Sequence, residues 1–269
     1  METAFDSVAE GYDNGFTNSV VGKAQRDLVW NYLEKILRNQ PDAKVLELNC
    51  GTGEDARWMA EKGATVLATD VSSRMVQISK LKMDSSELQQ KVVCRQMDVN
   101  NIDAVIGMDK FDIIFSNFGG LNCIEPEQFD NLLQYQLPSL LNKNGKMIFV
   151  VMPTFCLWES FYHTLLLKRK NIFRRFSNKP LEASIGSGET IQTWYYSPNW
   201  IKKHLPGNIE LQSVKPIGFF VPPSYLNHFF SRRAGFFNIL QRMEKKVSNL
   251  QLLASASDHY LIHLQKTEG

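Results

Sequence analysis

A stretch of small and polar residues at positions 47–56 carries the side chains best suited to chemistry. It follows a short apolar run and precedes a predicted helix. Glycine at positions 51 and 53 lets a ligand approach the backbone closely, and the N-terminus of the helix attracts a negative group. Asp70 ends the next apolar run, where a carboxylate can bind ribose hydroxyls. The pattern predicts a nucleotide-like ligand and, taken alone, also fits NAD, because Gly51-x-Gly53-x-x-Ala56 matches the loosened dinucleotide motif.

Alternating apolar runs and amphipathic segments supply the scaffold for these residues. The apolar runs predict strands at 44–48, 65–69, 92–96, 111–115 and 147–151. Helices are expected over 26–38, from the glycine stretch to about 62, from about 73, and over 127–141. Strands that alternate with helices in this way indicate parallel βαβ units and a doubly wound α/β sheet.

The alternation breaks after Pro153 and resumes near residue 209. A helix is expected over 155–176, a loop over 177–190 and a short strand near 193–196. A strand near 209–217, a long helix near 224–248 and a last strand at 259–264 follow. We expect residues 1–269 to form one domain in which 153–196 is an insertion over the carboxyl edge of the sheet, because that segment is too short for a core of its own.

Composition is that of an ordinary globular protein and argues against several function classes. The 269 residues are 43% hydrophobic and 22% charged, with a formal net charge of +2, so nothing global favours nucleic acid or an anionic membrane as partner. Four separated cysteines without a C-x-x-C pair argue against a zinc site or a disulfide framework. We therefore expect no metal, and a reducing, cytoplasmic location. The first residues do not resemble a signal peptide, and no apolar run is long enough to span a membrane.

The glycine stretch resembles the first motif of class I S-adenosylmethionine-dependent methyltransferases, an acidic residue followed by alternating small residues. Glu47 supplies the acid and Asn49-Cys50-Gly51-Thr52-Gly53 the loop, with Asn49 in place of the usual first glycine. Asparagine tolerates a positive φ, so the turn can survive this change. The resemblance implies a Rossmann-like sheet that is mostly parallel, with its last strand antiparallel and a helical insertion after the fifth strand.

Further segments resemble the same family in the same order, over residues 5–152. Residues 69–72 with Met75 match its ribose motif, 96–99 its adenine segment, 111–119 its fourth strand and following loop, and 144–148 the entry to its fifth strand. Residues 5–13 resemble the N-terminal segment of the ubiquinone and menaquinone biosynthesis methyltransferases, which implies a lid over residues 1–25. The cofactor residues implied are Tyr12, Glu47, Asn49, Cys50, Gly51, Thr52, Gly53, Asp70, Val71, Met75, Met97, Asp98, Val99, Asn117, Phe118 and Gly119.

The implied reaction is direct displacement at the methyl carbon of S-adenosylmethionine by a small acceptor. Aromatic residues in the C-terminal half favour an apolar or aromatic molecule. The sequence does not name a general base, and His163, His228 and His259 are the weak candidates. Asp258 and His259 are not expected to cooperate, because adjacent strand residues point to opposite faces. For Asp70 and Asp98 the alternative role is to cap the turn or helix that follows.

Three other functions remain as alternatives. An NAD(P)-dependent oxidoreductase is disfavoured by Glu47 and by the Asp98 segment. A nucleic-acid methyltransferase is disfavoured by Ser116-Asn117-Phe118-Gly119, which lacks the prolines of the base-methylating motif, and we expect no nucleic-acid partner. A non-catalytic scaffold that retains the fold is disfavoured, because it would have no physical need for this glycine spacing together with both acids. The mixed apolar and basic segment 161–176 is interpreted as a cap helix with a solvated basic face, in preference to a phosphate or membrane-surface contact, and no integral membrane contact is expected.

Overall fold

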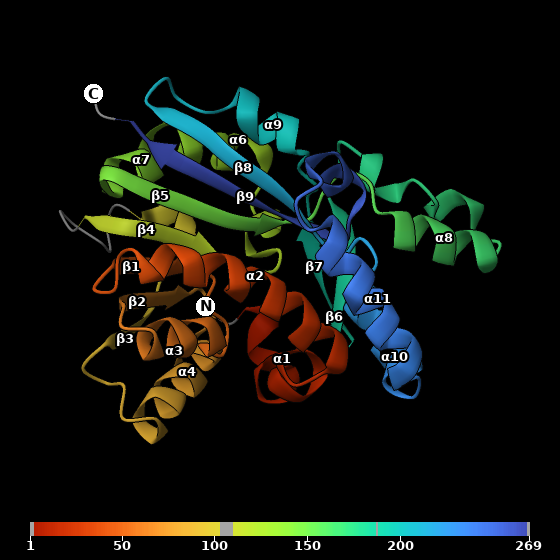
Figure 1. Cartoon of the computed structure of the whole chain (residues 1–269), viewed down its shortest axis with the longest axis horizontal. Coiled ribbons are helices and arrows are strands. Elements are labelled where there is room, and N and C mark those ends of the chain that lie inside the picture. The colour runs from red at the N-terminus through yellow and green to blue at the C-terminus, as the bar shows by residue number, and fades with distance from the viewer. Residues whose placement is uncertain (1–2, 103–109, 187, 268–269) are drawn as a thin grey trace.

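The computed structural model describes residues 3–102, 110–186 and 188–267, in which a seven-stranded sheet lies between helices (Figure 1). The strand order is β3-β2-β1-β4-β5-β9-β8. Strands β1 to β5 are parallel, and β9 is antiparallel to both of its neighbours, β5 and β8. This confirms the predicted fold class, with the antiparallel last strand inside the sheet. The strands are β1 (Lys44–Leu48), β2 (Thr65–Asp70), β3 (Val92–Gln96), β4 (Phe111–Ser116), β5 (Leu141–Val151), β8 (Ile209–Ile217) and β9 (His259–Lys266).

The central strands are apolar on both sides because helices cover both faces of the sheet. On β5, Ile148 and Val150 pack toward α2, α3 and α4, whereas Met147 and Phe149 pack toward α6, α7 and α9. A buried parallel strand has this continuous apolar character. The helices are α1 (Ala4–Tyr12), α2 (Val20–Arg38), α3 (Glu54–Glu61), α4 (Ser73–Ser85), α6 (Pro126–Asn131), α7 (Leu137–Leu140), α8 (Leu157–Leu165), α9 (Pro198–Lys203), α10 (Asn227–Ser231) and α11 (Ala234–Val247).

The segment after β5 differs from the expected single helix and loop. Helix α8 ends at Leu165, and Leu167 has a φ of 54°, a left-handed conformation that cannot continue a helix. The expected loop contains a hairpin of β6 (Leu181–Gly186) and β7 (Glu189–Thr193). Ile185 of this hairpin packs against Val8 and Ala9 of α1, so the segment contacts the N-terminal helix. Figure 1 shows β6 and β7 beside α1.

The long helix expected near 224–248 is also interrupted. Arg232 ends α10, and Arg233, with φ −132° and ψ 53°, separates it from α11. Helix α11 buries Phe237, Leu240 and Glu244 on one side. Among the described residues, no helix combines the length and the apolar character needed to cross a membrane.

Candidate cofactor and acceptor site

The loop between β1 and α3 follows the predicted turn closely. Asn49, Gly51 and Gly53 have φ values of 57°, 54° and 77°, so Asn49 adopts the left-handed conformation expected of it. A Cβ atom at Gly53 would lie 2.1 Å from Ser79 Oγ, so this glycine is required by packing against α4. A Cβ at Gly51 would meet only the ring of Tyr12, at 3.9 Å. Position 51 therefore borders open space, where a ligand can approach the backbone.

Asp70, at the end of β2, ties this loop to the start of α4. Its carboxylate accepts hydrogen bonds from the amides of Gly51, at 2.8 Å, and Ser72, at 2.9 Å. Ser72 is the N-cap of α4, because its hydroxyl accepts from the amide of Met75, while Asp70 bonds to the amide that precedes the helix. Burial raises the pKa of Asp70, with its two backbone hydrogen bonds opposing that effect. The carboxylate thus lies at the carboxyl edge beside the glycine loop.

The adenine segment after β3 gives a different result. Asp98 is exposed, and its carboxylate accepts from the amide of Asn100 at 2.9 Å, which caps the turn at Val99–Asn101. Met97 and Val99 are buried, and the amide of Met97 bonds to the carbonyl of Asp70 at 2.8 Å. The capping alternative for Asp98 is therefore present in the structure, and its adenine role stays a prediction.

Glu47 lies buried within β1, with 1% of its surface exposed. Its Oε2 atom has no hydrogen-bond partner among the described residues. Burial raises the pKa of Glu47 well above its usual value, the neighbouring Asp55 raises it further, and Arg26 lowers it. A buried carboxyl oxygen without a hydrogen bond costs folding free energy unless a donor bonds to it. Glu47 is therefore a candidate for contact with a positively charged or hydrogen-bond-donating ligand group.

This burial predicts that Glu47→Gln stabilises the ligand-free protein in a pH-dependent way. An acid whose folded-state pKa is raised costs stability above its unfolded pKa, and the cost grows as pH rises toward the folded value. We expect the melting temperature of Glu47→Gln to exceed that of wild type by a margin that widens from about pH 5 to about pH 8. Glu54→Gln is the control, and it should lower the melting temperature near neutral pH. Hydrogen bonds and charges from Arg57 and Lys82 lower the pKa of Glu54 despite its burial, so its ionised form stabilises the fold. Equal pH profiles for Glu47→Gln and wild type would contradict the assignment.

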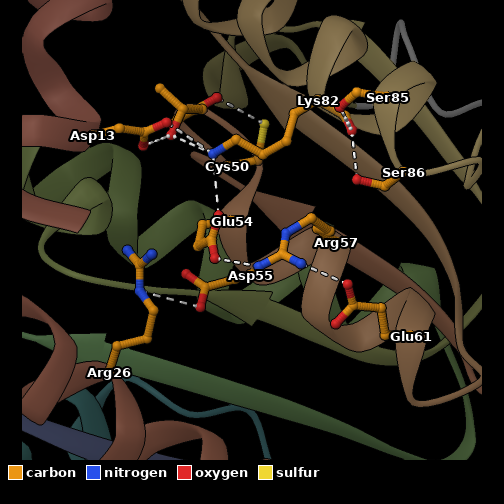
Figure 2. Close-up of polar contacts among 12 residues, drawn as sticks. Asp13, Arg26, Cys50, Glu54, Asp55, Arg57, Glu61, Lys82, Ser85 and Ser86 are labelled. Carbon is orange, nitrogen blue, oxygen red and sulfur yellow. Dashed lines mark hydrogen bonds and ion pairs between the residues drawn. The ribbon is translucent and has the colours of Figure 1, made fainter. Parts of the chain in front are cut away.

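Arg26 and Asp55 form a buried pair that the sequence analysis missed. Arg26 Nε lies 3.6 Å from Asp55 Oδ1, and both side chains are about 7% exposed (Figure 2). Asp55 also accepts hydrogen bonds from Trp30 Nε1 at 2.6 Å and Asn117 Nδ2 at 3.0 Å. In contrast, Nε and Nη1 of Arg26 donate no hydrogen bond among the described residues. In the sequence, Arg26 is one of the polar residues of a predicted amphipathic helix. The spacing of residues in that helix does not indicate that Arg26 faces the glycine loop.

Two aspartates bind the N-terminal segment, Asp13 to the glycine loop and Asp6 to the start of α4. Asp13 accepts from Thr52 Oγ1 at 2.6 Å and from Lys82 Nζ at 3.0 Å, and Lys82 also contacts Glu54 (Figure 2). Asp6 accepts from Ser72 Oγ at 2.7 Å and from the amide of Arg74. Burial alone would raise the pKa of both aspartates, but these hydrogen bonds lower it below its usual value. Ionised acids therefore hold α1 and the following turn over the loop.

A row of aromatic rings leads from this segment to the start of β9. Ring centroids are 5.8 Å apart for Tyr12 and Phe16, 5.0 Å for Phe16 and Phe118, and 5.6 Å for Phe118 and His259. Phe118 and Gly119 have positive φ values in the loop after β4. Arg26 lies 5.4 Å from the ring of Phe118, a cation–π distance. The row therefore links the N-terminal segment, the loop after β4 and the start of β9.

Of the three candidate histidines, only His259 has a ring contact with this row. His228 is exposed on α10, and His163 lies beside Tyr162 on α8. His259 Nδ1 is 3.2 Å from Asp258 Oδ2, so the two side chains lie side by side despite the alternation expected of a strand. The physical reason is that Asp258 precedes β9 and therefore escapes the alternation of a strand. No well-directed hydrogen bond to His259 Nδ1 is present among the described residues.

Asp258 is held in place by a buried network from the insertion and α2. Arg175 Nη2 lies 3.1 Å from Asp258 Oδ1, and Gln25 Nε2 donates to Oδ2 at 3.2 Å. Arg175 is held in turn by Glu159 of α8, at 2.9 Å. Burial would raise the pKa of Asp258, but His259 and Arg175 lower it below its usual value. The carboxylate beside His259 is therefore ionised and fixed.

Comparison with known proteins agrees with this arrangement. Residues 45–145 match the family of methyltransferase domains. A demethylmenaquinone methyltransferase of Clavibacter sepedonicus is 28% identical over 51% of this chain and 54% of its own length. A tRNA 5-carboxymethoxyuridine methyltransferase of Escherichia coli is 28% identical over 35% of this chain and 38% of its own length. The chain spans about half the length of the curated relatives it matches.

Solved structures share the fold over nearly the whole chain. An S-adenosylmethionine-dependent methyltransferase structure from Listeria monocytogenes has a TM-score of 0.59 and 21% identity, and covers 91% of this chain and 99% of its own. Magnesium protoporphyrin IX methyltransferase from Synechocystis, with bound S-adenosylhomocysteine, has a TM-score of 0.56 and 15% identity, over 92% and 88% of the two chains. Residues 45–145 therefore match a methyltransferase domain, and the chain shares the fold of these S-adenosylmethionine-dependent methyltransferase structures.

Proposed function

We propose that this protein transfers the methyl group of S-adenosylmethionine to a small apolar or aromatic acceptor. The observation that carries the proposal is the pair of buried, incompletely bonded groups beside the glycine loop. Arg26 offers free donors and Glu47 a free acceptor, which complement the carboxylate and ammonium groups of a zwitterionic amino acid. The carboxylate of Asp70, which accepts from the Gly51 amide at 2.8 Å, can also accept hydrogen bonds from ribose hydroxyls. The residues present thus fit both ends of the cofactor.

Bound S-adenosylmethionine supplies an electrophilic methyl carbon on a sulfonium, and the chain's own residues then orient and shield the reactants. The rings of Tyr12, Phe16 and Phe118 can exclude water from the reaction and present their faces to a cation. His259 contacts the ring of Phe118 and can accept a proton from the acceptor. Residues 1–25 act as a lid, supported by the bonds of Asp6 and Asp13, and 153–196 as a cap on the acceptor side.

An apolar acceptor is favoured by the aromatic residues of the insertion and by relatives whose names specify demethylmenaquinone. Trp158 and Phe230 pack together, as do Tyr162 and Tyr225, on the side of the cap nearest α10. The tRNA-modifying relative aligns over a smaller part of both chains, so it gives weaker support for a nucleic-acid acceptor. Neither the matching domain nor the structural neighbours favour an NAD-dependent oxidoreductase.

Calorimetric binding of S-adenosylmethionine, with NAD as the alternative ligand, tests the proposal. Gly51→Ala places a methyl group in the open space beside the loop, so we expect it to fold and to bind S-adenosylmethionine at least about tenfold more weakly. Gly188→Ala is the matched control, because its φ of 82° carries the same left-handed strain but nothing lies within 4 Å of the new Cβ. Binding of NAD and not S-adenosylmethionine by the wild type, or equal affinity in both variants, would overturn the assignment of this loop.

A further inference from the structure

The charges of this chain are strongly segregated in the fold. Two segments, 157–179 and 224–250, contain eleven of the 30 lysine and arginine residues but two of the 28 aspartate and glutamate residues. The rest of the chain therefore carries a net negative formal charge, although the whole chain is close to neutral. We refer to the surface of these two segments as the α8–α11 face.

Both acidic residues of the α8–α11 face are buried and used internally. Glu159 is 3% exposed and pairs with Arg174 and Arg175. Glu244 is fully buried and accepts hydrogen bonds from the backbone amides of 218–221. Lys168 and Arg169, by contrast, are exposed, as are Arg232 and Arg233 before α11. The charge that this face presents to solvent is therefore positive.

The same face exposes an unusual amount of apolar surface. All five exposed phenylalanines of the described residues lie on it. On α8, Leu157, Phe161 and Leu165 recur every fourth residue and are 46%, 55% and 65% exposed, which makes one apolar stripe. On α11, Phe236, Ile239 and Met243 form a second exposed stripe. A solvated basic cap helix would not place these side chains in water, so the interpretation of segment 161–176 from sequence is incomplete.

Aromatic contacts join α8 to α10 and α11. The rings of Tyr162 and Tyr225 are 5.5 Å apart, and those of Trp158 and Phe230 are 5.8 Å apart. Phe230 also stacks on Phe236 of α11, at 5.9 Å. In Figure 1, α8, α10 and α11 project together at one end of the long axis of the molecule. The two stripes therefore belong to elements that pack on one another.

We propose that the α8–α11 face docks the protein peripherally on an anionic lipid bilayer. Aromatic and aliphatic side chains can enter the boundary between headgroups and acyl chains, while flanking lysines and arginines contact anionic headgroups. Positive charge alone would also suit nucleic acid, but exposed Leu165, Ile239 and Met243 have no partner on a phosphate backbone. The charge complementarity and the aliphatic stripes together favour the lipid surface.

Co-sedimentation with vesicles tests this docking without reference to methyl transfer. We expect the full chain to bind vesicles of phosphatidylcholine and phosphatidylglycerol, and to bind phosphatidylcholine alone at least about tenfold more weakly. Binding to the anionic vesicles should also fall at high salt, since surface charges are then screened. The double variants Phe161→Ser with Leu165→Ser and Lys168→Glu with Arg169→Glu should each reduce binding at least about tenfold.

The matched control is Lys80→Glu with Leu81→Ser, which changes an exposed basic and apolar pair on α4, and this variant should bind as wild type does. Thermal melts of all variants establish that they are folded. Absence of wild-type binding to anionic vesicles, or equal binding by all variants, overturns the proposal. Saturating binding to transfer RNA in place of vesicles, or a dimer that is lost in Phe161→Ser with Leu165→Ser, would assign the face to nucleic acid or to a second copy of the chain and would equally overturn it.

Discussion

Replacing Arg26 with glutamine is expected to weaken S-adenosylmethionine binding by about two orders of magnitude. Removing one member of a buried, hydrogen-bonded charge pair typically costs about 2–5 kcal/mol, and each 1.4 kcal/mol is about tenfold in affinity. Arg26 keeps free donors beside the glycine loop, while its partner Asp55 has two other donors in Trp30 and Asn117. The guanidinium is therefore the member of this network best able to bind a ligand carboxylate.

A loss of affinity could also arise from disturbance of the fold, so the ligand itself supplies the decisive comparison. Wild type should prefer S-adenosylmethionine over its decarboxylated analogue, whereas Arg26→Gln should bind the two almost equally. Arg57→Gln is the control, since Arg57 bridges Glu54 and Glu61 on the outer side of α3 and should leave the preference unchanged (Figure 2). If Arg26→Gln kept the full preference for the carboxylated ligand, the role of Arg26 would be structural only.

Much of the fold was predictable because its signals are local. Each parallel strand is a short apolar run, and the loop after β1 carries glycine or asparagine where φ is positive. Even the hairpin that the sequence analysis missed has a local signal, because Leu181, Ala183 and Ile185 alternate with more exposed residues. The serine and glycine residues that follow favoured the prediction of a loop over 177–190 instead. Helix α8 was predicted too long because nothing in the sequence marks the left-handed turn at Leu167.

The site was predictable only where its residues are close in sequence to a motif. Gly51, Gly53 and Asp70 lie at ends of predicted strands, and the structure brings them together. Arg26 pairs with Asp55 across 29 positions of sequence, and Arg175 pairs with Asp258 across 83. Such pairs depend on how helices pack on the sheet, which periodicity does not specify. Adjacent residues can mislead too, as the position of Asp258 just outside β9 shows.

His259 is the residue whose replacement is expected to affect methyl transfer most while sparing cofactor binding. A positioned general base contributes about 10²–10⁴-fold to rate, so His259→Gln should lower kcat at least about a hundredfold with an acceptor whose proton must be removed. Its ring contacts Phe118, and the ionised Asp258 lies 3.2 Å from Nδ1. Arg175 and Gln25 fix that carboxylate beside the imidazole. Methyl transfer to a demethylmenaquinol analogue provides the assay, and calorimetry with S-adenosylmethionine should give nearly unchanged affinity.

The other two candidate histidines are natural controls for this experiment. His163→Gln and His228→Gln should keep kcat near the wild-type value, because neither ring contacts the aromatic row. Asp258→Asn should reduce kcat less than His259→Gln does, since Asp258 acts through the histidine and is a positioning residue. If His259→Gln turned over the acceptor as fast as wild type, the acceptor would need no base here, and the buried pair would serve to join the insertion to β9. A hundredfold loss confined to His259 would instead place the acceptor beside the rings of His259 and Phe118.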